Sequence, residues 1–313
     1  MKATSSKRKV MGEMVHELIK EIKELKKEKD AVILVHNYQR PEIYEIADHI
    51  EDSLGLAKAA TKSTAGTIVM CGVDFMAETA KILNPDKRVL LPDREANCPL
   101  ALTISSKDVL ELRDLHPRAA VMCYVNTMAS VKAVSDYCCT SMNMVKIINS
   151  IPEDEIIFVP DQNMAAWAQE QTKKRIIPWK GGHCYVHAGF TPEAVMIAKK
   201  NHPNAKVVAH PECPLPVLKM SDYVTGTGGM IKFTQEDKAK EFIILTEAGM
   251  VHRLQQVVPN KTFYSMGKIC MTQKKITLDK VRESLLKGRY EIKIPDDVLE
   301  SAQVALDRMM EYS

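Results

Sequence analysis

Short apolar segments recur along the chain in three sets, which follow one another in the same order. The first segments of the sets cover residues 31–35, 119–123 and 205–209, the second 67–70, 156–159 and 242–245, and the third 89–91, 175–177 and 262–264. They are predominantly apolar and rich in β-branched residues, which is typical of parallel strands buried on both faces. The pattern therefore predicts three strands in each of three repeats.

Segments with a helical period separate these strands, for example residues 77–83 (AETAKIL). Because alternating strands and helices form layered α/β domains, we expect an α/β protein with three repeated three-layer αβα domains and parallel sheets. The expected repeats are residues 1–116, 117–203 and 204–313, here named repeats 1, 2 and 3, arranged about a pseudo-threefold axis. An additional helix is expected at each end of the chain, near residues 12–29 and 295–311.

One cysteine follows the third strand of each repeat. These are Cys98, Cys184 and Cys270, at intervals of 86 residues. Loops at the carboxyl ends of parallel strands bind ligands, so equivalent loops from three repeats can meet at one centre. The chain has no C-x-x-C pair, which excludes the common local metal and redox motifs. The partners of each cysteine are then expected in the other two repeats.

Three thiolates at one centre leave several interpretations open. A [4Fe–4S] cluster on three cysteines would keep one iron open as a Lewis acid for non-redox chemistry. A zinc site would need a fourth ligand from His183 or His187, and neither histidine recurs in the other repeats. The cysteines are alternatively loop or core residues that a duplication has preserved, as we expect for Cys71, Cys123 and Cys138.

A polar triplet follows the first strand of each repeat. The triplets are His36-Asn-Tyr38, Tyr124-Val-Asn126 and His210-Pro-Glu212. Histidine can donate hydrogen bonds or move protons, Tyr and Asn can bind oxygen atoms, and Glu212 can act as a base. A single histidine is often a structural residue, but polar groups at three equivalent strand ends favour a binding site.

A hydroxyl residue recurs five positions after an aspartate: Ser53 after Asp48, Ser141 after Asp136 and Thr227 after Asp222. Each is followed by a helical pattern, so one interpretation is a simple N-cap. A helix start also presents free N–H groups to an anion. Three such starts around an axis would suit a substrate with two carboxylates, or with a carboxylate and a phosphate.

Composition and charge limit the class of protein. The chain is 45% hydrophobic and 27% charged, which is typical of a soluble globular protein. Its net charge of +3 is too small to indicate nucleic-acid binding. We find no apolar run long enough for a membrane span, and the basic first dozen residues lead into no apolar signal segment. We therefore expect a cytoplasmic protein, whose eight cysteines stay reduced.

Over almost its whole length the chain resembles the quinolinate synthase family. The matching stretches are residues 36–39 (HNYQ), 72–81 (GVDFMAETAK), 124–127 (YVNT), 179–187 (WKGGHCYVH) and 210–213 (HPEC), together with Cys270. The resemblance implies an enzyme of NAD biosynthesis that condenses iminoaspartate with dihydroxyacetone phosphate to quinolinate, releasing phosphate and water. An aspartate-oxidising enzyme would supply the iminoaspartate.

The resemblance also implies roles for individual residues. An oxygen-sensitive [4Fe–4S] cluster would bind Cys98, Cys184 and Cys270. Proton transfers fall to Glu212 and Tyr38, to which we add His210 as a third candidate. Substrate contacts fall to the following set: His36, Ser53, Tyr124, Asn126, Ser141, His210, Glu212 and Thr227. Two positions depart from the family pattern: Thr227 has a glycine on each side instead of a serine, and Gln273 replaces a frequent methionine. We expect the second change to have little effect on the cluster.

Two other classes of function are open from the residues themselves. A metal-free lyase would use a Schiff-base lysine, but no lysine occupies the repeated strand ends. An iron–sulfur sensor or scaffold would need the three thiols but no polar pocket beside them. Iron and sulfide analysis would separate the metal-free lyase from a cluster enzyme. A turnover assay would separate the sensor from an enzyme.

Overall fold

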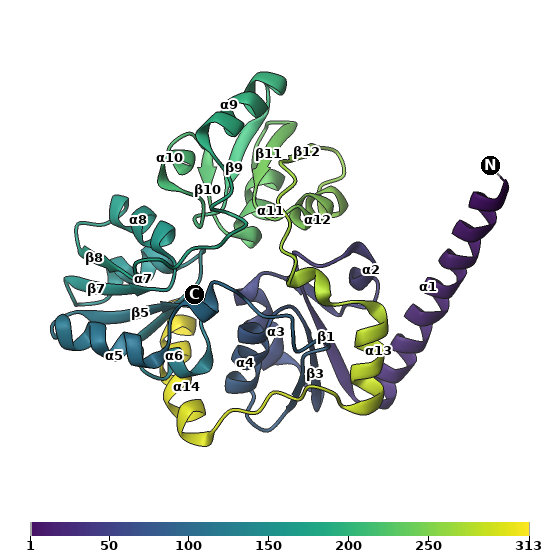
Figure 1. The fold of residues 1–313 in the computed structure, drawn as a ribbon, viewed down its shortest axis with the longest axis horizontal. Helices are drawn as coiled ribbons and strands as arrows, with labels where there is room; N and C mark the ends of the chain where they lie inside the picture. The colour runs from purple at the N-terminus through teal and green to yellow at the C-terminus, as the bar shows by residue number, and fades with distance from the viewer. Residues whose placement is uncertain (1, 313) are drawn as a thin grey trace.

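The computed structural model describes the backbone of residues 2–312 and the side chains of residues 12–312. It contains three four-stranded parallel sheets flanked by helices. Figure 1 shows the sheets in three lobes that surround a common centre. The fold class expected from the apolar pattern is therefore confirmed, whereas the domain boundaries near residues 116 and 203 stay a prediction.

The three repeats share one order of strands and α-helices, and repeats 1 and 3 add a 3-10 helix after the last strand. Repeat 1 comprises β1 (Ala31–His36), α2 (Pro41–Tyr44), β2 (His49–Glu51), α3 (Ser53–Lys62), β3 (Thr67–Cys71), α4 (Asp74–Leu83), β4 (Arg88–Leu90), the 3-10 helix η1 (Ala101–Thr103) and α5 (Ser106–Leu115). Repeat 2 comprises β5 (Ala120–Tyr124), α6 (Ala129–Lys132), β6 (Tyr137–Cys139), α7 (Met144–Ser150), β7 (Glu155–Val159), α8 (Gln162–Glu170), β8 (Arg175–Pro178) and α9 (Pro192–Asn201). Repeat 3 comprises β9 (Lys206–Ala209), α10 (Leu215–Leu218), β10 (Tyr223–Val224), α11 (Thr227–Glu236), β11 (Glu241–Leu245), α12 (Gly249–Val257), β12 (Thr262–Ser265), the 3-10 helix η2 (Gln273–Lys275) and α13 (Leu278–Lys287). The helices α1 (Lys2–Glu28) and α14 (Asp296–Glu311) complete the chain.

Each sheet has one strand more than the apolar pattern predicts. The strand orders are β2-β1-β3-β4, β6-β5-β7-β8 and β10-β9-β11-β12. The nine expected strands all form, and the additional ones, β2, β6 and β10, are edge strands of two or three residues. Such segments are too short to show a hydrophobic period, which is why the sequence does not reveal them.

A recurring aspartate fixes each of these edge strands. Asp48 accepts the backbone N–H of Ile33 through Oδ2 at 2.8 Å, and its own N–H donates to the Ile33 carbonyl at 2.9 Å. Asp136 and Asp222 repeat both contacts at the equivalent positions of repeats 2 and 3. These aspartates are therefore structural, although they recur in register with the candidate site residues.

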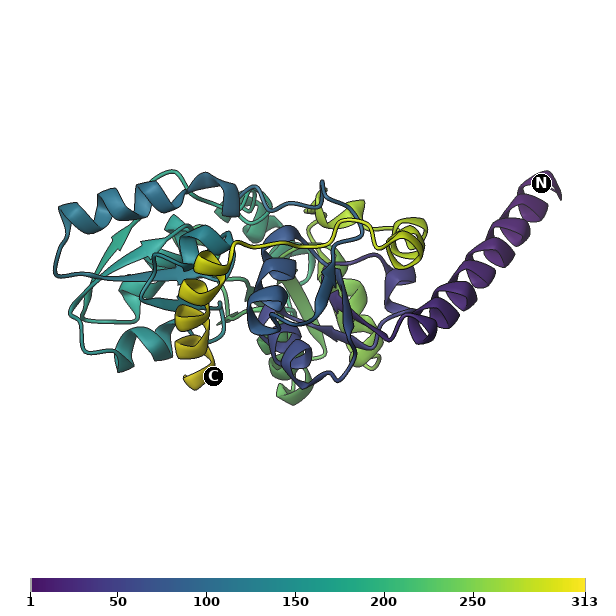
Figure 2. The same cartoon turned by 90° about the horizontal axis from the view of Figure 1, so that it is seen from below.

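The C-terminal segment leaves repeat 3 and packs on the other two repeats. Helix α13 lies along α1 and contacts β3, and α14 lies against α4, α6 and β6 (Figures 1 and 2). Arg308 of α14 donates from Nη1 to the carbonyl of Asp136 at 2.6 Å. Apolar residues of α13 and α14 join one core shared with repeats 1 and 2. The rest of repeat 3 contributes to two smaller clusters, one of which also includes Phe190 and Val195 of repeat 2.

The N-terminal helix begins at Lys2, not near residue 12, and projects away from the lobes (Figure 1). Only the C-terminal end of its apolar stripe, formed by Val15, Leu18, Ile19, Ile22 and Leu25, is covered: Ile22 and Leu25 are buried, whereas Val15 is exposed. The helix start was expected too late in the chain because the apolar stripe, which gives the helical period, begins only at Val15. None of the described helices has both the length and the apolar character needed to cross a membrane.

Candidate functional site

One cavity is lined by residues from all three repeats. It contains all three recurring cysteines and every residue expected as a substrate contact or acid–base group: His36, Tyr38, Ser53, Cys98, Tyr124, Asn126, Ser141, Cys184, His210, Glu212, Thr227 and Cys270. His36 and Tyr124 are the last residues of their strands, and His210 follows its strand directly. The cavity thus lies at the carboxyl ends of the strands, where open α/β sheets bind ligands.

The three recurring hydroxyl residues lie near helix starts but do not act as N-caps. Ser53 and Thr227 are the first residues of α3 and α11, whereas Ser141 lies in the turn before α7, which begins only at Met144. The side chain that caps α3 is Asp52, which accepts the N–H of Gly55 at 2.8 Å. The N-cap interpretation is therefore wrong for Ser53 and Thr227, and the hydroxyls line the cavity instead.

The glycines on both sides of Thr227 allow the other two repeats to approach. A Cβ atom on the preceding glycine would lie 2.3 Å from Oγ of Ser141, and one on the following glycine 2.5 Å from Oδ2 of Asp52. Thr227 itself accepts a hydrogen bond at Oγ1 from Nδ2 of Asn37 at 3.1 Å. The start of α11 is therefore a meeting point of all three repeats, with little space for larger residues.

A chain of close polar contacts connects Tyr38 to Glu212. The Tyr38 hydroxyl lies 2.6 Å from Oγ1 of Thr246, which lies 2.7 Å from Nε2 of His187. Nδ1 of His187 lies 2.7 Å from Oε2 of Glu212. Four groups from the three repeats thus form a row of close contacts, although the angle at Nδ1 of His187 does not meet that of a hydrogen bond. A small rotation of the His187 ring would complete a path along which a proton can move.

The sequence interpretation missed Thr246 and considered His187 only as a metal ligand. Thr246 follows β11 directly, but the residues after the equivalent strands are Gly72 and Pro160. A comparison of the three repeats therefore cannot find Thr246, because its polar side chain occurs in one repeat only. The available signal was its place at the carboxyl end of a central strand.

Glu212 is buried, with 3% of its surface exposed. Burial alone would raise its pKa, but interactions with His187 and then His210, and a hydrogen bond from Tyr124, lower the pKa to about 2. Asn126 adds a long contact from Nδ2 to Oε1 at 3.4 Å. Glu212 is therefore an ionised carboxylate at neutral pH, held among donors and able to accept a proton.

His36 and His210 are neutral donors with equivalent orientations. Burial, followed for His36 by the charge of Lys274, lowers the pKa of each imidazole to about 3. In each triplet the backbone N–H two residues later donates to Nδ1 at 3.3 Å, from Tyr38 to His36 and from Glu212 to His210. The proton of a neutral ring is then on Nε2, so each ring presents an N–H donor.

Gln273 belongs to the wall of the cavity and is buried. Its Oε1 accepts a hydrogen bond from Nε2 of Gln39 at 2.6 Å, and its Nε2 lies 3.5 Å from Nδ1 of His36. Gln273 therefore contacts the Nδ1 side of the His36 ring and leaves Nε2 free to face the cavity. A methionine at this position could make neither polar contact.

We expect Gln273→Met to lower the free energy of unfolding by about 1–3 kcal/mol, because the buried Gln39 amide loses its hydrogen-bond partner. Denaturant unfolding of the metal-free protein measures this change. The matched control is Gln39→Met/Gln273→Met, which removes both polar partners and should recover part of the loss. If the double variant is the less stable of the two, the hydrogen bond does not explain the effect.

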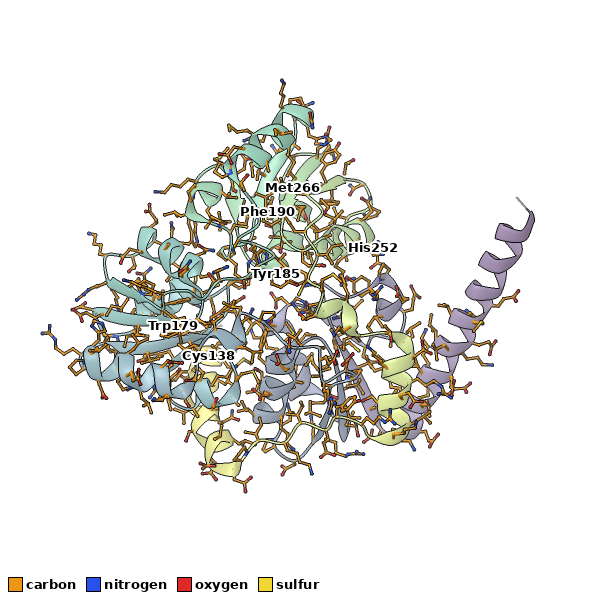
Figure 3. All side chains as sticks on the ribbon, in the orientation of Figure 1. Cys138, Trp179, Tyr185, Phe190, His252 and Met266 are labelled. Atoms are coloured by element: carbon orange, nitrogen blue, oxygen red, sulfur yellow. The ribbon has the colours of Figure 1, made fainter. Side chains whose placement is uncertain are left out.

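The three recurring cysteines are partly exposed in the cavity, whereas the other five are buried. Loops from repeats 2 and 3 are joined beside them, because the Tyr185 hydroxyl accepts the N–H of Met271 at 2.9 Å. Figure 3 shows Tyr185 near the centre, between the lobes. As expected, Cys71, Cys123 and Cys138 are core residues.

The cavity also contains a possible site for a single metal ion. Among the described residues, only Cys184, His187 and Glu212 bring three candidate donor atoms within 4.8 Å of one another. His183, the other histidine considered as a ligand, is exposed and does not line the cavity.

Comparisons with known proteins give one family. Residues 20–311 match the family model described as "Quinolinate synthetase A protein". Quinolinate synthase of Pyrococcus furiosus is 49% identical over 304 residues, covering 96% of this chain and 100% of the relative. Quinolinate synthase of Methanoregula boonei is 48% identical over 295 residues, covering 94% of this chain and 97% of the relative.

Proposed function

The chain belongs to the quinolinate synthetase A family, and from this premise we propose that it is a quinolinate synthase of NAD biosynthesis. In the proposed reaction, iminoaspartate and dihydroxyacetone phosphate condense to quinolinate, with release of phosphate and two waters. The observation that carries the proposal is the single cavity in which three thiols from three repeats lie beside polar side chains. An aspartate-oxidising enzyme would supply the iminoaspartate.

The cysteine set fits a [4Fe–4S] cluster. Cys98, Cys184 and Cys270 come from three repeats, line the same cavity and are partly exposed there. In a cluster of this kind each thiolate binds a different iron. When bound, the cluster would supply an iron without a protein ligand, which can act as a Lewis acid toward a hydroxyl or carboxylate.

The proposed substrates are anions, yet no lysine or arginine lines the cavity among the described residues. We infer that the carboxylates and phosphate bind neutral donors instead. The hydroxyls of Ser53, Ser141 and Thr227 lie beside helix starts, whose N–H groups favour anions. The Nε2–H groups of His36 and His210 add directed donors, as do the hydroxyls of other lining residues.

Proton transfers are assigned to the path between Tyr38 and Glu212. Burial, and next the charge of Glu212, raise the pKa of Tyr38 well above its usual value, so its hydroxyl stays protonated and can donate. Glu212 is ionised and can accept, while Thr246 and His187 connect the two. One end of the path can therefore protonate the substrate while the other removes a proton.

Replacing Thr246 by valine is expected to lower kcat about a hundredfold while the bound iron is retained, because only the bridging hydroxyl is removed. Steady-state kinetics with iron analysis measures both quantities. Thr234→Val is the matched control, since the Thr234 hydroxyl bonds within α11, outside the cavity lining. An unchanged kcat in Thr246→Val would exclude the path.

Three alternatives predict different results. A Schiff-base lyase needs a lysine in the cavity, and none of the described lysines lines it. A sensor would contain the cluster but form no product. An enzyme that holds one ion through Cys184, His187 and Glu212 would contain a metal but no sulfide.

The deciding experiment is anaerobic reconstitution with iron and sulfide, followed by a quinolinate assay with both substrates. About four irons and four sulfides per chain with turnover support the proposal. A loaded cluster without product would favour the sensor, and a single metal with product would favour the mononuclear site.

A further inference from the structure

The same hydrogen bond holds the cysteine loop in every repeat. A carboxylate accepts the backbone N–H of the loop cysteine, at 3.1 Å for Cys98 on Asp74, 3.2 Å for Cys184 on Asp161 and 3.2 Å for Cys270 on Glu247. The helices α4, α8 and α12 follow β3, β7 and β11. Each carboxylate lies in the first turn of one of these helices or just before it. None of the three carboxylates was singled out from the sequence.

A second contact accompanies each of these bonds. The carbonyl two residues before the cysteine accepts a backbone N–H from the same helix start. The donor–acceptor pairs are Asp74 to Ala96 at 2.9 Å, Gln162 to Gly182 at 2.8 Å and Ala248 to Lys268 at 2.8 Å. The loop is therefore fixed on both sides of the residue that precedes the cysteine, in all three repeats.

The carboxylates are themselves fixed by their helices. Asp161 caps α8 with Oδ1, which accepts the N–H groups of Asn163 and Met164, while Oδ2 accepts from Cys184. The two oxygens of Glu247 also have different partners: Oε1 accepts the N–H of Cys270, and Oε2 accepts the N–H of Gly249. Both side chains are fully buried. A buried acceptor held in this way leaves the cysteine N–H little freedom.

Asp74 uses its oxygens differently. Its Oδ1 alone accepts both the N–H of Phe75 at 2.8 Å and that of Cys98 at 3.1 Å. The amide oxygen of an asparagine could keep both bonds at position 74. At position 161 an asparagine has one acceptor for two separate sets of N–H groups, and whichever way the amide turns, one set faces an NH₂ group.

We propose that Asp74, Asp161 and Glu247 are positioning residues of the cysteine site. Each holds the N–H of its cysteine away from the cavity, so that the sulfur is directed into it before the cluster binds. The inference rests on the proposed function, because it assumes that the three thiols hold one iron–sulfur group. It adds residues that act through the loop cysteines and determine how firmly the group is held; Asp74 and Asp161 lie outside the cavity lining, whereas Glu247 belongs to it.

Two isosteric variants test this inference. Asp161→Asn should release iron to a chelator roughly 10–100-fold faster than the parent protein and show an altered visible and EPR spectrum, the size expected for groups that orient metal ligands. Asp74→Asn is the matched control, since it also removes one carboxylate but keeps the acceptor, and should release iron at nearly the parent rate. Asp74→Leu, which removes the acceptor, should behave like Asp161→Asn.

Each outcome has a defined meaning. Equal iron release in all variants would overturn the inference while leaving the proposed function intact, provided that the parent protein binds iron and sulfide. Equal acceleration in Asp161→Asn and Asp74→Asn would show that the carboxylate charge matters, not the acceptor geometry, and would also overturn it. If Asp161→Asn does not fold, the comparison of Asp74→Leu with Asp74→Asn decides alone. A parent protein without iron would instead contradict the proposed function.

Discussion

Cys184→Ala is expected to abolish both cluster binding and quinolinate formation. The loop that contains Cys184 supplies one of three thiols to the cavity, and an alanine leaves one iron of the cluster without its thiolate. Iron and sulfide analysis after anaerobic reconstitution measures the first effect, and a product assay the second. The same result is expected for Cys98→Ala and Cys270→Ala.

Cys71→Ala is the matched control for these variants. Cys71 is fully buried in β3 and does not line the cavity, so its loss should cost about 1 kcal/mol of stability and leave iron content and turnover unchanged. Parent-like iron content in Cys184→Ala would mean that another set of residues holds the metal. The site formed by Cys184, His187 and Glu212 would be excluded by the same result.

Glu212→Gln is expected to retain the cluster and lower kcat by roughly 10²–10⁴-fold. Glutamine keeps the size of the side chain but cannot accept a proton from the path through His187. Steady-state kinetics on the iron-loaded variant measures the loss. Glu155→Gln changes a carboxylate that pairs with Arg175 outside the cavity lining and should leave kcat unchanged.

Normal turnover in Glu212→Gln would remove this residue as the base. Loss of iron in the same variant would give Glu212 a different role, as a ligand in the single-ion site. The two measurements together therefore separate acid–base chemistry from metal binding. Because the pKa of Glu212 is lowered to about 2, activity that depends on its ionised form should persist to acidic pH.

The repeated part of the molecule could be predicted from the sequence, because each feature occurs three times in register. The strands that begin at Ala31, Ala120 and Lys206, the cysteine loops and the polar triplets all belong to this part. A single apolar run is ambiguous between a strand and a buried helix, but three equivalent runs in the same order are not. The convergence of distant cysteines on one cavity follows from the same repetition.

The features that the sequence did not reveal either occur once or look ordinary. Thr246 and Gln273 lie in one repeat only, so their contacts with His187 and Gln39 depend on tertiary packing. Asp161 looks like a common N-cap, and its second bond to Cys184 spans 23 residues. The first helix begins before its apolar stripe, so its start gives no pattern to detect.

The last two helices tie the C-terminal end of the chain to the first two lobes. Helix α13 contacts α1 and β3, α14 contacts α4, α6 and β6, and Arg308 donates to the carbonyl of Asp136 (Figure 2). Because the cavity groups come from all three repeats, their spacing depends on how the lobes are held together. Residues 278–311 therefore help to set the geometry of the cavity although none of them lines it.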